Sequence, residues 1–367
     1  MTLSDSFATL RPSIDEATAT SLAHLLARAG GSGRSEEFSR AILASVSGGK
    51  RFRALMAHVG YALSSETPIE EVSLPHLSAA LELYQASALV HDDIIDKADE
   101  RRGMPTPHRT LAHHHASSSW IGSSTDFGRH AAILVGDFLF SAATAAADEQ
   151  ALTLRQDCAR AFARRFADMH AEVALGQYLD ITAEQSPLDP QRTDALSTSD
   201  SPDVALHKSE RYSVVHPAIL GAICGAPSID GVAELLNVLE TILTPWGLAF
   251  QLRDDDLGVF GDPAVTGKPA GDDLREGKRT ALLALTWEAS SPAERRALTD
   301  VLGVTEASAE QIATATEIVE RNGRAAHEAE IARLVADGHA ALDASSFTDD
   351  ARAMLRELCS ILTARRA

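Results

Sequence analysis

Apolar residues recur at helical spacing along most of the chain. Stretches such as TATSLAHLLARAG and EIVERNGRAAHEAEIARLVADGHAALDA combine Leu, Ala and Ile with Glu and Arg, residues that a helix holds at little cost. Alternation of the strand type, with Val, Ile or Thr at every second position, is almost absent. We therefore predict an all-α protein with helices over about 14–29, 36–46, 50–64, 74–98, 130–147, 150–183, 204–225, 229–258, 279–290, 308–340 and 349–365.

Clusters of Gly, Pro and Ser interrupt this pattern. The longest are the Ser-rich segment 113–129 and SPLDPQRTDALSTSDSPD at 186–203. Helical apolar runs resume on both sides of each break, so we predict a single domain over 1–367. The triplet His113, His114 and His115 lies in the first segment without a partner cluster, and we expect a solvated loop there in preference to a metal site.

Charge and composition exclude several classes of function. The chain has 33 basic and 52 acidic residues, and a formal charge of -19 repels nucleic acid and anionic membranes. Cys158, Cys224 and Cys359 lie far apart, which favours buried thiols in a reducing compartment. With no basic and apolar start and no run of about 18 uncharged apolar residues, we expect a cytoplasmic protein without stable membrane insertion.

The stretch ALVHDDIIDKADERRGMPTPHR, residues 88–109, gathers three carboxylates at the end of an apolar run. On one helix Asp92 and Asp96 share a face, while Asp93 points about 100° away. Two stacked carboxylates repel each other unless a cation lies between them, and Mg²⁺ is usually held by carboxylates together with substrate phosphates. A solvated acidic helix end is the alternative, although the apolar ASALV before the cluster counts against it.

A second acidic cluster repeats this arrangement in LAFQLRDDDLGVFGDPAVTGKPAGDDLREGKR. Asp254, Asp255 and Asp256 end a long apolar stretch, and basic residues follow. The Gly-containing loop is not a P-loop, because Pro269 stands where Ser or Thr is needed. Two acidic helix ends, each followed by basic residues, suggest facing carboxylates that clamp magnesium on a polyanion.

These motifs, taken in order, resemble those of the trans-isoprenyl diphosphate synthases, or polyprenyl synthetases. They are GGKRFR at 48–53, DDIID followed by RRG, GDFLF at 136–140, GQYLD at 176–180, KS at 208–209 and QLRDDDLG at 251–258. The loops after the last motif are similar to those of actinobacterial members, of the geranylgeranyl diphosphate synthase type. The resemblance implies a bundle of about a dozen helices around a deep central cavity, usually as a homodimer.

The resemblance also implies a reaction. Such enzymes join isopentenyl diphosphate head to tail onto an allylic diphosphate with the help of about three Mg²⁺ ions in each active site. Their motifs carry roles onto this chain. By this resemblance, Asp92, Asp96 and Asp254 bind the metal ions, with Asp93 and Asp255 close by. Arg101, Lys208 and Lys268 contact the allylic diphosphate; Lys50, Arg53 and Arg102 form the isopentenyl pocket; and Lys278 is a weaker candidate for a phosphate contact. Gln251 and Ser209 lie beside the reacting carbons, with Gln177 a further polar candidate.

Three positions depart from the family pattern. Gly258 replaces the last aspartate of the second acidic motif, and Gln85 stands where many members have a histidine in the isopentenyl site. An amide can donate to a phosphate oxygen but carries no charge. Ser209 replaces threonine and keeps the hydroxyl.

Product length is read from the residues that precede Asp92. We expect Ala88, Ser87, Tyr84 and Leu81 to share its inward face. Tyr84 is then the first bulky group, about 12 Å along the axis from Asp92 against about 7.5 Å for Ser87, which predicts geranylgeranyl diphosphate, or a product one isoprene unit longer. The alternative is that Tyr84 only packs in the core.

Three other interpretations stay open. One is a noncatalytic, synthase-like subunit that modulates a partner chain. Another is a terpene cyclase, which ionises one allylic diphosphate and has no need of a second basic pocket. The last is a helical scaffold with acidic helix ends.

Overall fold

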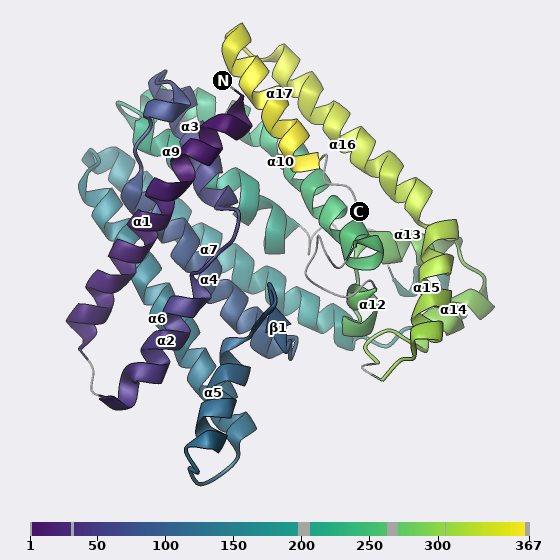
Figure 1. Cartoon of the computed structure of the whole chain (residues 1–367). Coiled ribbons are helices and arrows are strands. Elements are labelled where there is room, and N and C mark those ends of the chain that lie inside the picture. Colours follow the sequence, from purple (N-terminus) through teal and green to yellow (C-terminus); the bar gives the residue numbers. More distant parts are fainter. Residues whose placement is uncertain (1, 31–32, 197–205, 263–270, 305, 364–367) are drawn as a thin grey trace. The chain divides into compact units, whose positions relative to one another are not determined.

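The computed structural model describes residues 2–30, 33–196, 206–262, 271–304 and 306–363, with side chains except those of 34 and 206–210. Most of these residues are helical, which confirms the all-α prediction (Figure 1). The strands described are β1 (Glu100–Arg101) and β2 (Met104–Pro105), which form one short antiparallel hairpin. The chain divides into two compact units, Met1–Phe166 with Pro217–Ala233 and Ala167–His216 with Glu234–Ala367. The single domain over 1–367 stays a prediction.

The first unit is built around the helix that carries the first acidic motif. Its elements are α1 (Leu3–Ala29), η1 (Gly33–Ser35), α2 (Glu36–Ser45), α3 (Phe52–Ser65), η2 (Ile69–Glu71), α4 (Pro75–Ile95), α5 (Pro107–Ser117), α6 (Ser124–Leu152) and most of α9 (His216–Gly225). Helix α4 packs on α1 and α6, and α5 packs on α6 (Figure 1). Leu77, Leu81 and Leu83 of α4 are 0% exposed and form the centre of this core.

The second unit contains the second acidic motif. Its elements are the C-terminal part of α7 (Gln156–Gln185), η3 (Thr193–Ala195), the π-helix η4 (Leu206–Val215), most of α10 (Ile229–Phe260), α12 (Asp272–Glu276), α13 (Ala281–Ala289), α14 (Pro292–Thr299), α15 (Ala309–Asn322), α16 (Arg324–Ala344) and α17 (Asp349–Thr363). Trp246 and Trp287 are 0% exposed. Their indole N–H groups donate to the carbonyls of Val335 and Arg192, so burial leaves neither donor unsatisfied.

The prediction of a loop over the whole of 113–129 is wrong. His113, His114 and His115 belong to α5, and α6 already begins at Ser124. The His115 ring is buried, pairs through Nε2 with the carbonyl of Ile121 at 3.1 Å and packs against Trp120 and Phe127. Packing of the buried His115 ring against these two aromatic residues outweighs the low helix propensity of the local residues.

Other helix boundaries also differ from the expected ones. The helix expected at 14–29 begins at Leu3, where Thr2 and Asp5 form a capping box. The helix expected at 308–340 is two helices that meet at Gly323. A Cβ atom at Gly323 would lie 2.0 Å from Thr286 Oγ1, so glycine permits the close contact at this break.

Among the described helices, α6 alone has the length and hydropathy that could span a membrane. This test uses length and composition only, and the core helix of a soluble protein passes it too. Because α6 packs on both α4 and α5, its apolar residues contribute to the core of the first unit.

Candidate active site

The first acidic motif lies at the C-terminal end of α4. The helix closes with the Asp96 N–H donating to the Asp92 carbonyl at 2.8 Å, and Lys97 takes a positive φ of 56° just beyond it. The Asp92 side chain is 24% exposed, whereas that of Asp93 is 2% exposed. The two neighbouring carboxylates therefore have different environments, as their angular separation on the helix predicts.

Arg101 joins these two carboxylates. Its Nε donates to Asp93 Oδ1 at 2.6 Å, and its Nη2 donates to Asp92 Oδ2 at 3.4 Å. Arg101 stands at the base of the β1–β2 hairpin, whose two turn residues, Arg102 and Gly103, have φ values of 56° and 73°. Positive φ at both positions is the requirement of a type I′ turn. The RRG motif is thus a tight hairpin that Asp93 holds against the end of α4.

Arg102, in the turn of the same hairpin, reaches the loop that carries the basic motif GGKRFR. Its Nη1 donates to the carbonyl of Ser47 at 3.1 Å. Burial is the main cause that lowers the pKa of Arg102, and the nearby charges of Arg101, Arg51 and Arg53 lower it further. Several guanidiniums therefore lie close enough to repel one another, an arrangement that an anion would stabilise.

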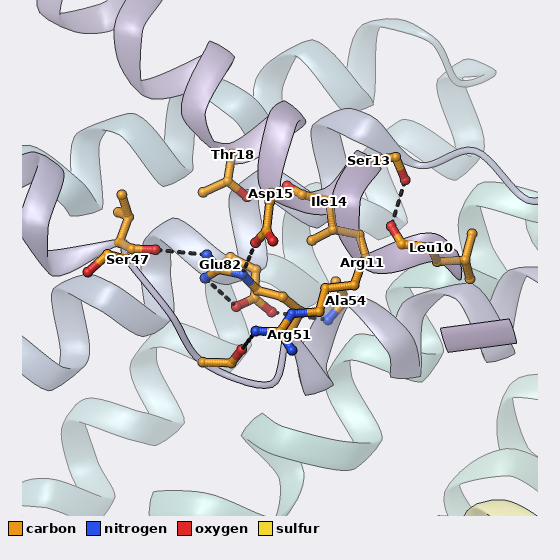
Figure 2. Close-up of polar contacts among 12 residues, drawn as sticks. Leu10, Arg11, Ser13, Ile14, Asp15, Thr18, Ser47, Arg51, Ala54 and Glu82 are labelled. Carbon is orange, nitrogen blue, oxygen red and sulfur yellow. Dashed lines mark hydrogen bonds and ion pairs between the residues drawn. The ribbon is translucent and has the colours of Figure 1, made fainter. Parts of the chain in front are cut away.

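Lys50 and Arg53, the other residues expected in the isopentenyl pocket, flank a residue that the sequence reasoning missed. Arg51 is buried and donates to Asp15, Glu82 and the Val46 carbonyl (Figure 2). Lys50 is exposed and Arg53 is half-buried. The role of Arg51 was missed because the carboxylates that bind it, Asp15 and Glu82, are distant in the sequence.

The residues expected to control product length do not all share one direction. Gln85 and Ala88 are half-buried, like Asp92. The Ser87 hydroxyl is buried and donates to the Gly136 carbonyl of α6 at 2.8 Å, about 140° around α4 from Asp92, so the expected shared face is wrong for Ser87. Tyr84 also contacts α6, with its ring centroid 5.9 Å from that of Phe140 in an edge-on arrangement.

The second acidic motif lies near the end of α10, and its three aspartates have three different surroundings. Asp254 is half-buried. Asp255 Oδ1 accepts a hydrogen bond from Gln251 Nε2 at 2.9 Å, so the Gln251 amide contacts a carboxylate in this structure. Asp256 is 1% exposed and is paired with Arg324 of α16 at 2.9 Å, which makes it a structural residue.

Two further carboxylates, which the sequence reasoning did not assign, lie close to Asp255. The pKa of Asp255 is raised well above its ordinary value, mainly by burial. The hydrogen bond from Gln251 lowers this pKa, and the charges of Asp273, Asp254 and Asp180 raise it further. Asp180 belongs to the GQYLD motif and Asp273 to the GDDLREGK segment. Both motifs were noticed in the sequence, but the proximity of their aspartates to Asp255 depends on the packing of α7 and α12 near α10.

The structure describes the side chains of only some of the remaining candidate residues. The Lys278 ammonium lies 2.6 Å from Glu276 Oε2 and 3.9 Å from Asp273 Oδ1. Lys268 and the side chains of Lys208 and Ser209 lie outside the described residues. Gln177 is half-buried on α7, three residues before Asp180.

The backbone at 208–209 belongs to the π-helix η4, a form that is often found at functional sites. Its second half is anchored to α7, where Glu172 accepts from Arg211 at 2.9 Å and pairs with His216 at 2.8 Å. Arg211 also donates to Glu240 of α10 at 3.3 Å. The segment that carries Lys208 and Ser209 is thus held by charged contacts on its C-terminal side.

The donor chemistry at Asp92 and Asp96 fits magnesium. These carboxylates lie one helical turn apart, both partly buried, and offer hard oxygen donors next to basic residues. Across the described ranges, no three His, Cys, Asp or Glu side chains form a complete metal cage. Asp92 and Asp254 belong to different units, so the expectation that they face each other across one cavity stays a prediction.

Comparison with known proteins agrees with the motifs. The family model described as polyprenyl synthetase matches residues 35–319. The geranylfarnesyl diphosphate synthase of Aeropyrum pernix is 30% identical over 82% of this chain and 86% of its own, and the geranylgeranyl diphosphate synthase of Mycobacterium tuberculosis is 30% identical over 80% and 75%. The crystal structure of geranylgeranyl pyrophosphate synthase from Corynebacterium glutamicum, complexed with isoprenyl diphosphate and magnesium, is 33% identical, covers 100% of both chains and has a TM-score of 0.84.

Proposed function

This chain belongs to the polyprenyl synthetase family and is a prenyltransferase, and from that premise we propose that it condenses isopentenyl diphosphate with an allylic diphosphate to make geranylgeranyl diphosphate. The observation that carries the proposal is the convergence, within the first unit, of a carboxylate-tipped helix and a group of guanidiniums. Asp92 lies 3.4 Å from Arg101, and Arg102 is close to Arg101 and Arg53. Such a site can hold a divalent cation and two diphosphates together.

Each group in this site has a distinct task. Asp92 and Asp96 would hold magnesium ions and, as the family motifs imply, Asp254 would hold another; bound magnesium would supply the positive charge that stabilises a leaving diphosphate. Asp93, buried against Arg101, keeps that guanidinium at the diphosphate. Lys208 and Lys268 add to the contacts with the allylic substrate.

The isopentenyl pocket consists of Lys50, Arg53 and Arg102, with Gln85 as an uncharged donor. It holds the homoallylic diphosphate so that the alkene lies beside the allylic carbon. The C–O bond of the allylic diphosphate breaks, the alkene carbon bonds to the allylic cation, and one proton is lost to the departing diphosphate. Gln251, Ser209 and Gln177 supply polar groups near the reacting carbons, and Gln251 also fixes Asp255.

Two aromatic residues support the proposed product length. Tyr84 is 6% exposed and meets the Phe140 ring, so in the proposed site it is the first bulky residue of α4 beyond the small residue Ala88. A chain that grows from Asp92 along α4 passes Ala88 before it reaches Tyr84, which limits it to about twenty carbons.

We also propose a cytoplasmic homodimer without stable membrane insertion. Ile133, Leu134 and Phe140 of α6 are 43%, 57% and 39% exposed, an apolar surface that a second copy would cover. Leu134→Glu should shift the sedimentation of the protein from dimer to monomer, whereas Thr314→Glu, an exposed change on α15, should not. A monomeric wild-type protein at micromolar concentration contradicts the dimer.

The deciding experiment is incubation of the purified chain with Mg²⁺, labelled isopentenyl diphosphate and, in turn, dimethylallyl, geranyl and farnesyl diphosphate. We expect twenty-carbon diphosphate from each. Mainly fifteen-carbon product contradicts the length argument. Release of a hydrocarbon or alcohol without consumption of isopentenyl diphosphate identifies a cyclase, and absence of product from the chain alone identifies a noncatalytic subunit.

A further inference from the structure

The loop that carries Lys50 is held by helix α1, which lies ahead of the segment that the family model matches. Arg51 is the link. Its side chain is 9% exposed, its Nε donates to Asp15 Oδ1 of α1 at 2.6 Å, and its Nη2 donates to the Val46 carbonyl at 2.8 Å (Figure 2). A buried guanidinium needs such partners, because an uncompensated charge in the interior is costly.

A second residue of α1 contacts the same loop. Arg11 Nη2 donates to the Gly49 carbonyl at 2.9 Å, immediately before Lys50 (Figure 2). On the other side, Arg102 donates to the Ser47 carbonyl. The carbonyls at 46, 47 and 49 thus each accept from an arginine, which fixes the path of the loop.

The backbone of this loop requires that support. Gly48, Gly49 and Arg51 have φ values of 69°, 92° and 53°. A left-handed conformation costs a non-glycine residue about 1 kcal/mol or more, and such conformations persist where surrounding contacts over-determine them. The contacts of Arg51 with Asp15 and Glu82 supply this restraint.

We propose that Asp15 and Arg11 are positioning residues for the isopentenyl diphosphate pocket, acting through Arg51 and the Gly49 carbonyl. The proposal rests on the function proposed above. Because Arg51 is committed to protein carboxylates, the cations of GGKRFR that meet the substrate are Lys50 and Arg53. Their placement depends on the loop, and the loop depends on α1.

The position of Asp15 allows a positioning role to be distinguished from a general structural role. The Asp15 side chain is 45% exposed and Arg11 lies on the surface. Without Asp15, Arg51 keeps Glu82 and the Val46 carbonyl as partners, so the variants should still fold. The allylic site lies at Asp92, Asp96 and Arg101, at the C-terminal end of α4 and in the hairpin beyond it. A positioning role therefore predicts an effect on one substrate only.

The test is steady-state kinetics of the full chain with each substrate varied in turn. Asp15→Asn and Arg11→Ala should raise KM for isopentenyl diphosphate about fivefold to tenfold, with KM for farnesyl diphosphate and kcat within about twofold of wild type. Asp15→Glu should restore most of the affinity. Glu16→Gln and Arg28→Ala remove the same charges from exposed positions of α1 and serve as controls.

A second measurement does not need turnover. Calorimetric titration with inorganic pyrophosphate in EDTA reports the basic residues alone, and Asp15→Asn should weaken this binding several-fold while Glu16→Gln does not. Unchanged values in both assays overturn the proposal, as does an equal rise in KM for both substrates. If the wild-type protein binds pyrophosphate in EDTA but makes no product, the proposed function is contradicted. The titration of Asp15→Asn then still decides whether α1 positions the basic residues.

Discussion

The carboxylate of Asp273 occupies the space beside Gly258 that a side chain would need. A Cβ atom at Gly258 would lie 1.9 Å from Asp273 Oδ2 and 2.3 Å from Asp273 Cγ. Gly258 is the position where the family pattern has the last aspartate of the second acidic motif. In this chain a carboxylate is present there, but it comes from α12.

Restoring the family aspartate should therefore damage the protein. Gly258→Asp forces Asp273 to move and brings two like charges together, so we expect the free energy of unfolding to fall by about 1–3 kcal/mol and kcat to fall with it. Thermal unfolding with and without Mg²⁺ and pyrophosphate measures this. Asp273→Ala in the Gly258→Asp background vacates the space and should recover part of the loss. Wild-type stability of Gly258→Asp would show that the contact is unimportant.

The carboxylates at the end of α4 should be needed for turnover. Asp92→Asn and Asp96→Asn each remove one magnesium-binding charge, and we expect kcat/KM to fall by about 100-fold or more. The control is Asp99→Asn, just beyond the helix, where the side chain is 73% exposed. Equal activities of the three variants would contradict the metal assignment.

Tyr84 should limit the product. Tyr84→Ala removes the ring that meets Phe140, and we expect products at least one isoprene unit longer, resolved by chromatography. Tyr84→Phe keeps the ring and should keep the twenty-carbon product. If Tyr84→Ala makes only the wild-type product, Tyr84 is a core residue without a role in length.

Glu172 should make stability depend on pH in the acid range. Burial raises its pKa, but hydrogen bonds and charge from His216 and Arg211 outweigh this and lower it to about 2 from 4.5. The unfolded state then binds more protons between these values, so the free energy of unfolding should fall as pH drops from about 5 toward 2. Urea unfolding at several pH values measures the slope. Glu172→Gln should have a shallower slope, and an unchanged slope would refute the assignment.

Long amphipathic helices were predictable from the sequence, and packing explains the failures. The helices expected at 74–98 and 229–258 agree closely with α4 and α10 because their apolar residues repeat over many turns. The loop expected at 113–129 failed because the buried His115 ring packs against Trp120 and Phe127, a contact that local composition does not reveal.

The candidate site was predictable where one motif supplies all the residues. Asp92, Asp93 and Arg101 are near neighbours in the sequence, and they are paired in the structure. Asp180, Asp273 and the partners of Arg51 were missed because they come from separate helices that only tertiary packing brings together. Ser87 was assigned to the wrong face for a different reason, because five residues along one helix separate two side chains by about 140°.

The anchoring of Arg51 by α1 bears on how this protein is prepared for study. Expression of residues 35–319 alone, the limits that a family match suggests, would delete Asp15 and Arg11 together with the buried Ile14 and Leu22. Arg51 would then lack one of its two carboxylates, and an apolar surface would face water. Such a shortened protein should aggregate or lose its affinity for isopentenyl diphosphate, although every family motif would still be present in it.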